Sequence, residues 1–163
     1  MERLELAIEP HGLWHFSFTV SDLDSAVNFY TELLGFHFVH RQVQYNEYTR
    51  RLVGYPEAVI EIAQLAIPGC AVRTSTHDLE LVHYLRPTRK VSQVDIATPG
   101  AAHLALAVTD LKAAHERLVR AGVEFVSEPN RITHGVNRGG YAVYFYGPDR
   151  IVHELVQAPP RSG

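Results

Sequence analysis

The sequence predicts an α+β fold made of two tandem modules, each a strand, a helix and three further strands. The phrase "LWHFSFTVSDLDSAVNFYTELLGF" (13–36) returns as "AHLALAVTDLKAAHERLVRAGV" (102–123). Both modules also close on the tripeptide Glu-Leu-Val, at 80–82 and at 154–156. Such a repeat indicates a duplicated structural unit. We expect modules at about 12–85 and 101–158, joined by the polar, proline-punctuated linker 86–100, within one domain spanning 1–163.

In the first module, strand alternation places Phe16 and Phe18 on one face and His15 and Ser17 on the other. A helix follows, because apolar residues recur there at intervals of three and four. Ser21 or Asp22 can cap this helix, and Gly35 ends it. The apolar stripe needs a partner, and the Phe16/Phe18 face is the nearest one. The first histidine is therefore expected on the sheet face away from the helix.

The second module repeats this arrangement, with His103 opposite the face formed by Leu104 and Leu106. Next to each histidine the same face carries only small residues, which leaves room for a ligand. The remaining strands are expected at 37–44, 58–66, 78–85, 123–126, 140–146 and 151–157. We interpret the histidines at 77, 115 and 134 as loop or helix-surface residues.

Composition narrows the function classes. The chain has 163 residues, is 46% hydrophobic and 20% charged, and carries a net charge of −3. These values are typical of a globular domain and give no basic field for nucleic acid or for an anionic membrane. The opening "MERLELAIEP" lacks the apolar run of a signal peptide. The single Cys70 excludes an intramolecular disulfide, so we expect a cytoplasmic protein.

A glutamate is also repeated in the two modules, in the strand that closes each of them. Glu80 and Glu154 each lie inside an apolar closing strand, where a carboxylate is costly to bury without compensation. Two imidazoles and two carboxylates suit one divalent cation such as Zn, Ni, Co, Mn or Fe(II). A single strand histidine or glutamate is most often a surface residue. The repetition of both at matched positions favours metal ligation by His15, Glu80, His103 and Glu154.

The doubled phrase and the ending "GPDRIVHELVQ" resemble the vicinal oxygen chelate superfamily, over about residues 12 to 158. This superfamily includes glyoxalase I, methylmalonyl-CoA epimerase, extradiol dioxygenases, fosfomycin-resistance transferases and bleomycin-binding proteins. The resemblance implies a curved mixed sheet around a metal, with the helices on the convex face. It also implies a small-molecule substrate and a homodimer, with the paired modules meeting either within one chain or across the dimer.

The resemblance carries the four ligands over residue by residue, and the His/Glu/His/Glu set looks most like glyoxalase I. Methylmalonyl-CoA epimerases usually have Gln in place of Glu80, and extradiol dioxygenases have His there. Bleomycin-binding members generally lack the ligands. Glu80 therefore favours proton transfer over oxygen activation. The alternatives that stay open are a lactoylglutathione lyase, an Fe(II) dioxygenase and an antibiotic-binding resistance protein.

The expected reaction is abstraction of a proton beside a carbonyl group, giving an isomerase or epimerase. Glu154 is the first candidate for the base and Glu80 could return the proton. Glu61 is a third candidate, although an outward-facing strand glutamate is at least as plausible there.

Two long loops, 44–57 and 127–140, are expected to select the substrate. Their stretches "YTRRLVGYPEAVIEIAQL" and "GVNRGGYAVYFYGPD" are similar to the branch that epimerises 2-epi-5-epi-valiolone. No glutathione site can be identified in the sequence. The candidate substrate residues are Tyr45, Tyr48, Arg50, Arg51, Asn137 and Arg138.

Overall fold

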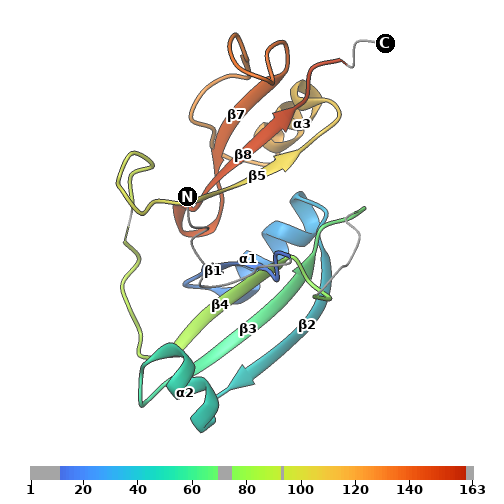
Figure 1. Cartoon of the computed structure of the whole chain (residues 1–163). Coiled ribbons are helices and arrows are strands. Elements are labelled where there is room, and N and C mark those ends of the chain that lie inside the picture. The colour runs from blue at the N-terminus through green and yellow to red at the C-terminus, as the bar shows by residue number, and fades with distance from the viewer. Residues whose placement is uncertain (1–11, 70–74, 93, 161–163) are drawn as a thin grey trace, which may run out of the picture. The chain divides into compact units, whose positions relative to one another are not determined.

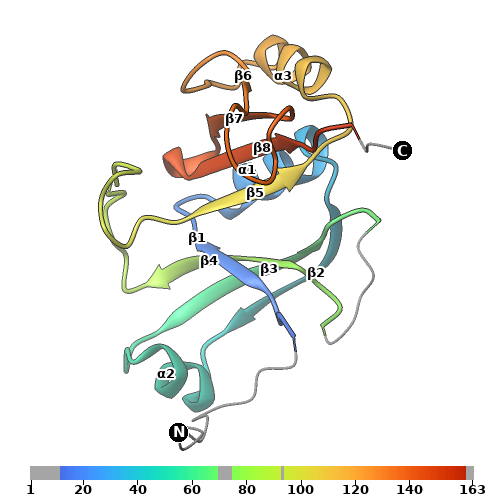
Figure 2. The same ribbon diagram turned by 45° about the horizontal axis from the view of Figure 1, so that its top comes forward.

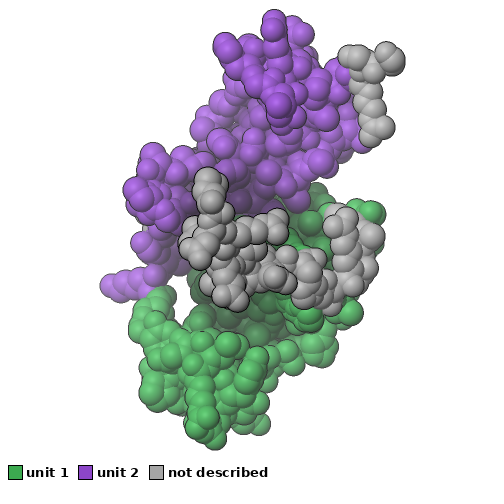
Figure 3. Space-filling model, in the orientation of Figure 1, with its two compact units in different colours: residues 1–89 green, residues 90–163 purple. Residues whose placement is uncertain are grey.

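A computed structural model describes residues 12–69, 75–92 and 94–160 of the chain (Figures 1 and 2). The chain divides into two compact units, Met1–Arg89 and Lys90–Gly163 (Figure 3). The division falls inside the segment 86–100 that the sequence indicates as a linker. Cys70 lies outside the described residues. Among the described helices, none combines the length and the apolar character needed to cross a membrane.

The first unit contains a four-stranded mixed sheet in the order β1-β4-β3-β2. β1 pairs with β4 in parallel, and the other two pairings are antiparallel. β2, β3 and β4 run side by side in Figure 1. All four strands lie within a few residues of their predicted positions. Their bounds are β1 (Phe16–Thr19), β2 (His37–Gln44), β3 (Val59–Ala66) and β4 (Leu79–Arg86).

Helix α1 (Leu23–Asn28) covers one face of this sheet and continues as the π-helical turn η1 (Phe29–Leu33). Of the two candidate caps, Asp22 is the one used, because its carboxylate accepts a hydrogen bond from the Ser25 backbone N–H at 3.0 Å. Gly35 follows the helix with φ +75°, a conformation that favours glycine at a helix end. Phe18 is buried and Ser17 is exposed, as expected for a helix that covers the face away from Ser17. The core shared by α1 and the sheet contains Leu23, Ala26, Tyr30, Leu65, Leu79 and Leu81.

A helix absent from the sequence prediction interrupts the first long loop. The segment 44–57 contains α2 (Glu47–Val53), which lies where β2 ends and β3 begins (Figure 1). Asn46 caps it by accepting a hydrogen bond from the Thr49 backbone N–H at 2.9 Å, and Gly54 ends it with φ +76°. Both capping residues were visible in the sequence. The helix was missed because its apolar positions are too few to form a stripe.

The second unit repeats the sheet, in the order β5-β8-β7-β6, again with a parallel pairing between its first and last strands. Helix α3 (Leu111–Arg120) begins at Asp110, whose carboxylate accepts a hydrogen bond from the Ala113 backbone N–H at 3.0 Å. Both modules therefore start their helix on an aligned aspartate. The strands are β5 (His103–Ala107), β6 (Asn130–Arg131), β7 (Tyr141–Tyr146) and β8 (Val152–Gln157), with a 3₁₀ turn at Pro148–Arg150.

The predicted strand at 123–126 is wrong. Only an isolated bridge joins Phe125 to Phe145, and the edge strand is the two-residue β6. Ser127 to Pro129 follow after only four residues of the predicted strand, and a proline cannot donate to a strand ladder. The α+β class is confirmed, and each module contributes its own four-stranded mixed sheet where the sequence predicted one curved sheet.

The first prediction concerns the core of the first unit. Leu81 is fully buried on β4, so Leu81→Ala should lower the free energy of unfolding by about 2–5 kcal/mol through lost burial and a residual cavity. Urea denaturation followed by circular dichroism measures the change. Val136→Ala is the matched control, because Val136 is 96% exposed and its loss should stay within about 0.5 kcal/mol. Equal effects of the two changes would contradict the packing described.

The second prediction concerns pH. Burial lowers the pKa of His153 to about 4 in the folded protein, whereas an unfolded histidine titrates near ~6.5. Because the unfolded state takes up the proton first, stability should be complete above about pH 6.5 and fall as pH drops towards 4, by about 3 kcal/mol. Unfolding curves recorded in EDTA should show this fall in stability for wild type. His153→Leu should lack it. The same slope in both proteins would contradict the assignment, and His134→Leu, in an exposed loop, serves as control.

Candidate metal centre

The same strand register places a histidine and a glutamate together in each module. In the parallel pairing of β1 with β4, Ser17 lies opposite Glu80, and in that of β5 with β8, Ala105 lies opposite Glu154. The histidine stands two residues before Ser17 in one module and two before Ala105 in the other. Residues two apart on a strand point to the same face. Each glutamate therefore shares a face with the repeated histidine of its own module.

In the first unit, the Nε2 atom of His15 lies 3.9 Å from a carboxylate oxygen of Glu80. A second histidine, His77, contributes its Nε2 atom 3.7 Å from the other oxygen of Glu80. One possible ligand atom from each of these three residues lies within 4.8 Å of the others. Two imidazoles and a carboxylate at this spacing form a donor set suited to a divalent cation.

His77 was missed by the sequence reasoning, which interpreted it as a loop residue of no special role. It does lie in a loop before β4, but its side chain is only 5% exposed. Burial lowers its pKa, and the nearby His15 lowers it further. No repeat could have revealed it, because the corresponding residue of the second module, three before Glu154, is Ile151.

In the second unit, the Nε2 atom of His103 lies 3.3 Å from a carboxylate oxygen of Glu154. The ring of Tyr144 packs edge-on against His103, with centroids 5.2 Å apart. Tyr144 is also the register partner of Glu154 on the neighbouring strand. Burial raises the pKa of the Tyr144 hydroxyl, and the charge of Glu154 raises it further. A protonated phenol therefore stands beside the carboxylate.

The opposite face of the second sheet is filled by a row of rings. His115 on α3 contacts Phe125, which contacts Phe145, which stacks on the fully buried His153. Because His153 and Glu154 are consecutive on one strand, this row lies on the helix-bearing face and Glu154 points away from it. His103 and Glu154 thus lie on the face that the helix leaves uncovered, as the alternation predicted.

Apolar side chains adjoin the glutamate on the first sheet. Ile60, Ile62 and Val82 form a buried cluster, and Val53 of α2 and Tyr84 pack against it. Val82 and Tyr84 share the face of Glu80 by strand alternation. Burial raises the pKa of the Tyr84 hydroxyl, and the nearby Tyr55 raises it further. The polar group therefore borders an apolar surface, as is common in small-molecule sites.

Glu61 lies elsewhere. Its carboxylate accepts a hydrogen bond from Arg41 at 2.9 Å, and Arg41 also pairs with Asp24 of α1. This contact puts Glu61 on the helix-bearing face of β3, three residues from Gln64, the register partner of Glu80. The described polar partner of Glu61 is Arg41, and the structure does not bring the Glu61 carboxylate to His15 or His77.

The six candidate substrate residues are all exposed. Tyr48 and Arg51 line a surface hollow on the outer side of α2, together with Glu47 and Leu52. Thr49, which the sequence analysis did not select, is the buried polar residue of this helix. The hairpin loop that carries Asn137 and Arg138 is held by backbone hydrogen bonds, among them Gly140 N–H to the Asn137 carbonyl. None of the six is brought to a His–Glu pair within its own unit by a described contact.

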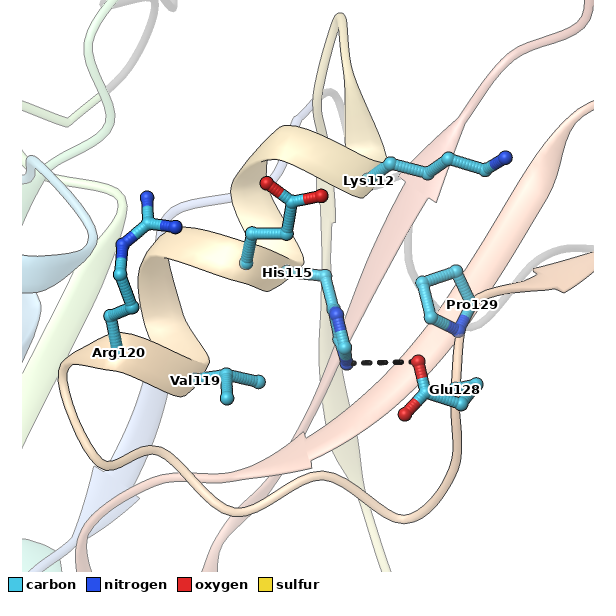
Figure 4. Close-up of a pocket in the computed structure, with 7 residues that line it drawn as sticks. Lys112, His115, Val119, Arg120, Glu128 and Pro129 are labelled. Carbon is cyan, nitrogen blue, oxygen red and sulfur yellow. Dashed lines mark ion pairs between the residues drawn. The ribbon is translucent and has the colours of Figure 1, made fainter.

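A separate pocket of about 490 Å³ lies along α3 (Figure 4). In Figure 4, His115 points from the helix towards Glu128, at 4.0 Å between the Nε2 atom and a carboxylate oxygen. The expectation of a helix-surface histidine was wrong, because His115 is buried and its Nε2 atom has no hydrogen-bond partner among the described residues. The pocket shares no residue with either His–Glu pair.

Comparison with known proteins gives a consistent family. Residues 12–155 match the model of the Glyoxalase/Bleomycin resistance protein/Dioxygenase superfamily. A 2-epi-5-epi-valiolone epimerase of Actinomyces sp is 34% identical over 149 residues, which cover 89% of this chain and 78% of that protein. A lactoylglutathione lyase of Arabidopsis thaliana is 27% identical over 148 residues, 90% of this chain but 44% of the lyase.

The fold is also found in solved structures. A glyoxalase family protein of Bacillus cereus superposes with a TM-score of 0.77, at 22% identity, covering 95% of this chain and 99% of that one. At that identity the likeness concerns the fold alone.

Proposed function

Since the chain belongs to the glyoxalase/bleomycin resistance protein/dioxygenase superfamily, we propose that it is a divalent-metal-dependent isomerase or epimerase. It would move a proton beside a carbonyl group of a small oxygenated substrate. The observation that carries the proposal is the repeated His–Glu pair, at the same strand register and on the sheet face opposite α1 in the first unit and opposite α3 in the second. Carboxylates in these positions would be compensated by a cation.

The proposed ligand set is one pair from each module, His15 with Glu80 and His103 with Glu154, contributed by one chain or by two chains of a homodimer. The donor chemistry fits Zn, Ni, Co, Mn or Fe(II). When bound, such an ion would polarise substrate oxygens and make the neighbouring C–H acidic. The reducing cytoplasm is the proposed location.

Glu154 is the proposed base, because its surroundings leave it the freer of the two carboxylates. Glu80 has two histidines within 4 Å, His15 and His77. In its own unit Glu154 has one described histidine partner, His103. Glu154 can therefore take a proton from the substrate carbon while Glu80 stays in place. The Tyr144 hydroxyl, kept protonated beside Glu154, is able to donate a hydrogen bond to a substrate oxygen.

The proposed substrate class is a polyhydroxylated cyclic ketone, supported by the 34% identity to the 2-epi-5-epi-valiolone epimerase. The apolar cluster beside Glu80 would contact a ring carbon face, and the tyrosines and arginines of 44–57 would contact hydroxyl groups. A lactoylglutathione lyase is the second candidate, favoured by the Arabidopsis thaliana relative and by the His/Glu/His/Glu set.

The third prediction is that metal binding needs both modules. After EDTA treatment, wild-type protein should bind Zn²⁺ in a chelator competition. His15→Ala and His103→Ala should each lower the Zn²⁺ affinity by more than the roughly 10–100-fold that is typical when an outer hydrogen-bond partner of a metal ligand is lost. Reconstitution with Ni²⁺, Co²⁺, Mn²⁺ and Fe²⁺ then identifies the ion that supports turnover.

The control for this titration is His83→Ala. His83 stands three residues from Glu80 on β4 and is the strand register partner of Glu61. It therefore lies on the helix-bearing face, and its loss should leave the Zn²⁺ affinity unchanged. If His103→Ala bound Zn²⁺ as tightly as wild type, the first module would bind the ion alone, through His15, His77 and Glu80, and the two-module ligand set would be wrong.

The fourth prediction identifies the base. Glu154→Gln keeps an oxygen that can bind a cation but loses its basicity, so turnover should fall by roughly 10²–10⁴ while most of the metal is retained. In deuterated water, wild type acting on 2-epi-5-epi-valiolone should place deuterium on the carbon beside the carbonyl without consuming O₂. Mass spectrometry and an oxygen electrode measure the two quantities, and Glu116→Gln, an exposed helix change, is the inert control.

Different outcomes would assign different chemistry. The same loss in Glu80→Gln, with Glu154→Gln active, would make Glu80 the base. Turnover of the hemithioacetal of methylglyoxal and glutathione, with none of the cyclic ketone, would favour the lyase. Oxygen uptake that tracks turnover would contradict proton transfer altogether, and tight binding of an antibiotic such as bleomycin without turnover would contradict an enzyme.

A further inference from the structure

A chain of side-chain contacts leads from the candidate ligand His15 away from Glu80. The Nδ1 atom of His15 lies 3.0 Å from the Nε2 atom of His77, a hydrogen-bond distance between two ring nitrogens. The Nδ1 atom of His77 lies 2.9 Å from the hydroxyl oxygen of Ser75. Both nitrogens of this buried imidazole are therefore used, one on each side.

Ser75 permits the direction that a metal ligand at His15 requires. Its hydroxyl oxygen accepts the backbone N–H of His77 at 3.3 Å, and it can accept a second hydrogen bond from the ring of the same residue. When His77 donates its Nδ1–H to the same oxygen, its Nε2 atom is the unprotonated one and can only accept. The proton in the contact between the two histidines then belongs to the Nδ1 atom of His15. The Nε2 atom of His15 is left with a free lone pair.

That free nitrogen is the one that faces the glutamate. The Nε2 atom of His15 points to Glu80 and the Nε2 atom of His103 points to Glu154, so the two modules present the same ring nitrogen. Metal-binding histidines usually donate their other N–H to an outer partner, which fixes both the tautomer and the ring orientation. Carboxylates, carbonyls and water commonly fill that place, and here a second imidazole does.

The backbone around His77 holds it firmly in this place. The next residue, Asp78, accepts the Phe16 N–H through its backbone carbonyl and donates its own N–H to the Leu65 carbonyl, each at 2.9 Å. The Asp78 carboxylate accepts the Ile67 N–H at 2.8 Å. His77 is thus anchored to both β1 and β3, and its ring lies 4.9 Å from that of His15 between centroids.

We propose that His77, supported by Ser75, is a positioning residue that fixes His15 in the Nδ1–H tautomer and directs its Nε2 lone pair towards the cation site. The inference rests on the proposed function, since it concerns a ligand of the proposed cation. It makes the two modules unequal: one histidine ligand is held by a hydrogen-bonded chain, and the other, His103, is packed against the ring of Tyr144.

The test compares variants that remove or keep the acceptor. His77→Leu removes it, and His77→Gln replaces it with a carbonyl oxygen that can accept the same proton. On metal-free protein above pH 8, long-range ¹H–¹⁵N correlation spectra report which nitrogen of His15 carries the proton. Wild type should show the Nδ1–H form and His77→Leu should shift towards the Nε2–H form. Chelator competition should show a loss of about 10–100-fold in Zn²⁺ affinity for His77→Leu, and His77→Gln should recover most of it.

Two further variants guard the interpretation. Ser75→Ala removes the outer acceptor without touching either imidazole, so it should give a smaller loss of affinity in the same direction even if His77→Leu folds poorly. His83→Leu, on the helix-bearing face of β4, should leave both the His15 tautomer and the affinity unchanged. Circular dichroism spectra check that each protein is folded.

Contrary results are specific. A wild-type His15 that carries its proton on Nε2 would overturn the inference, and so would a loss of Zn²⁺ affinity that His77→Gln fails to restore, because His77 would then be a ligand itself. The two failures are distinguishable. If the wild-type protein bound no divalent cation, the proposed function would fall even with His15 in the Nδ1–H form. If it bound the cation but His15 were protonated on Nε2, only the role of His77 would fall.

Discussion

The parallel pairing between the first and last strands of each module determines where the candidate ligands lie. A parallel neighbour fixes which residue of the closing strand stands beside the opening strand, and a slip of one position would turn the glutamate to the buried face. The register is the same in both modules, Ser17 opposite Glu80 and Ala105 opposite Glu154. Helix packing maintains it, because Leu81 and Leu155, the residues after the glutamates, are buried on the other face. The core of each unit thus positions its polar pair.

The two modules share the same His–Glu pair and strand pairing, but the residues around the two glutamates differ. Glu80 has Gln64 as its register partner and a buried histidine nearby, whereas Glu154 has Tyr144 as its partner. A carboxylate that serves only as a ligand benefits from being held, and one that carries a proton needs freedom to move. The same duplicated scaffold can therefore supply both roles, since the residues that differ lie beside the glutamates and leave the strand pairing unchanged.

The sequence predicts the parts that are repeated or periodic. Most strands, both covering helices and the face of each histidine follow from alternation, from three-to-four spacing and from alignment of the two modules. The choice of Asp22 over Ser21 as the first cap needed the structure. Helix α2 was missed because its apolar positions are too few to form a stripe, although Asn46 and Gly54 mark its ends. The predicted strand 123–126 fails because Pro129 and its neighbours divert the chain after a single bridge.

The sequence does not predict contacts between distant side chains that occur in only one of the two modules. His77 lies 62 positions after His15 in the sequence, and the hydrogen bonds of Asp78 to β1 and β3 hold it beside that residue. Glu61 shows the opposite case, since its place in an apolar run resembles that of Glu80, yet the register of β3 puts it on the helix-bearing face, where Arg41 pairs with it. Two glutamates in similar sequence surroundings thus differ because one has an arginine for a partner and the other has two imidazoles. An arginine satisfies a carboxylate permanently, whereas imidazoles can turn their lone pairs to a cation, and this difference in partner is what distinguishes a structural carboxylate from a candidate ligand.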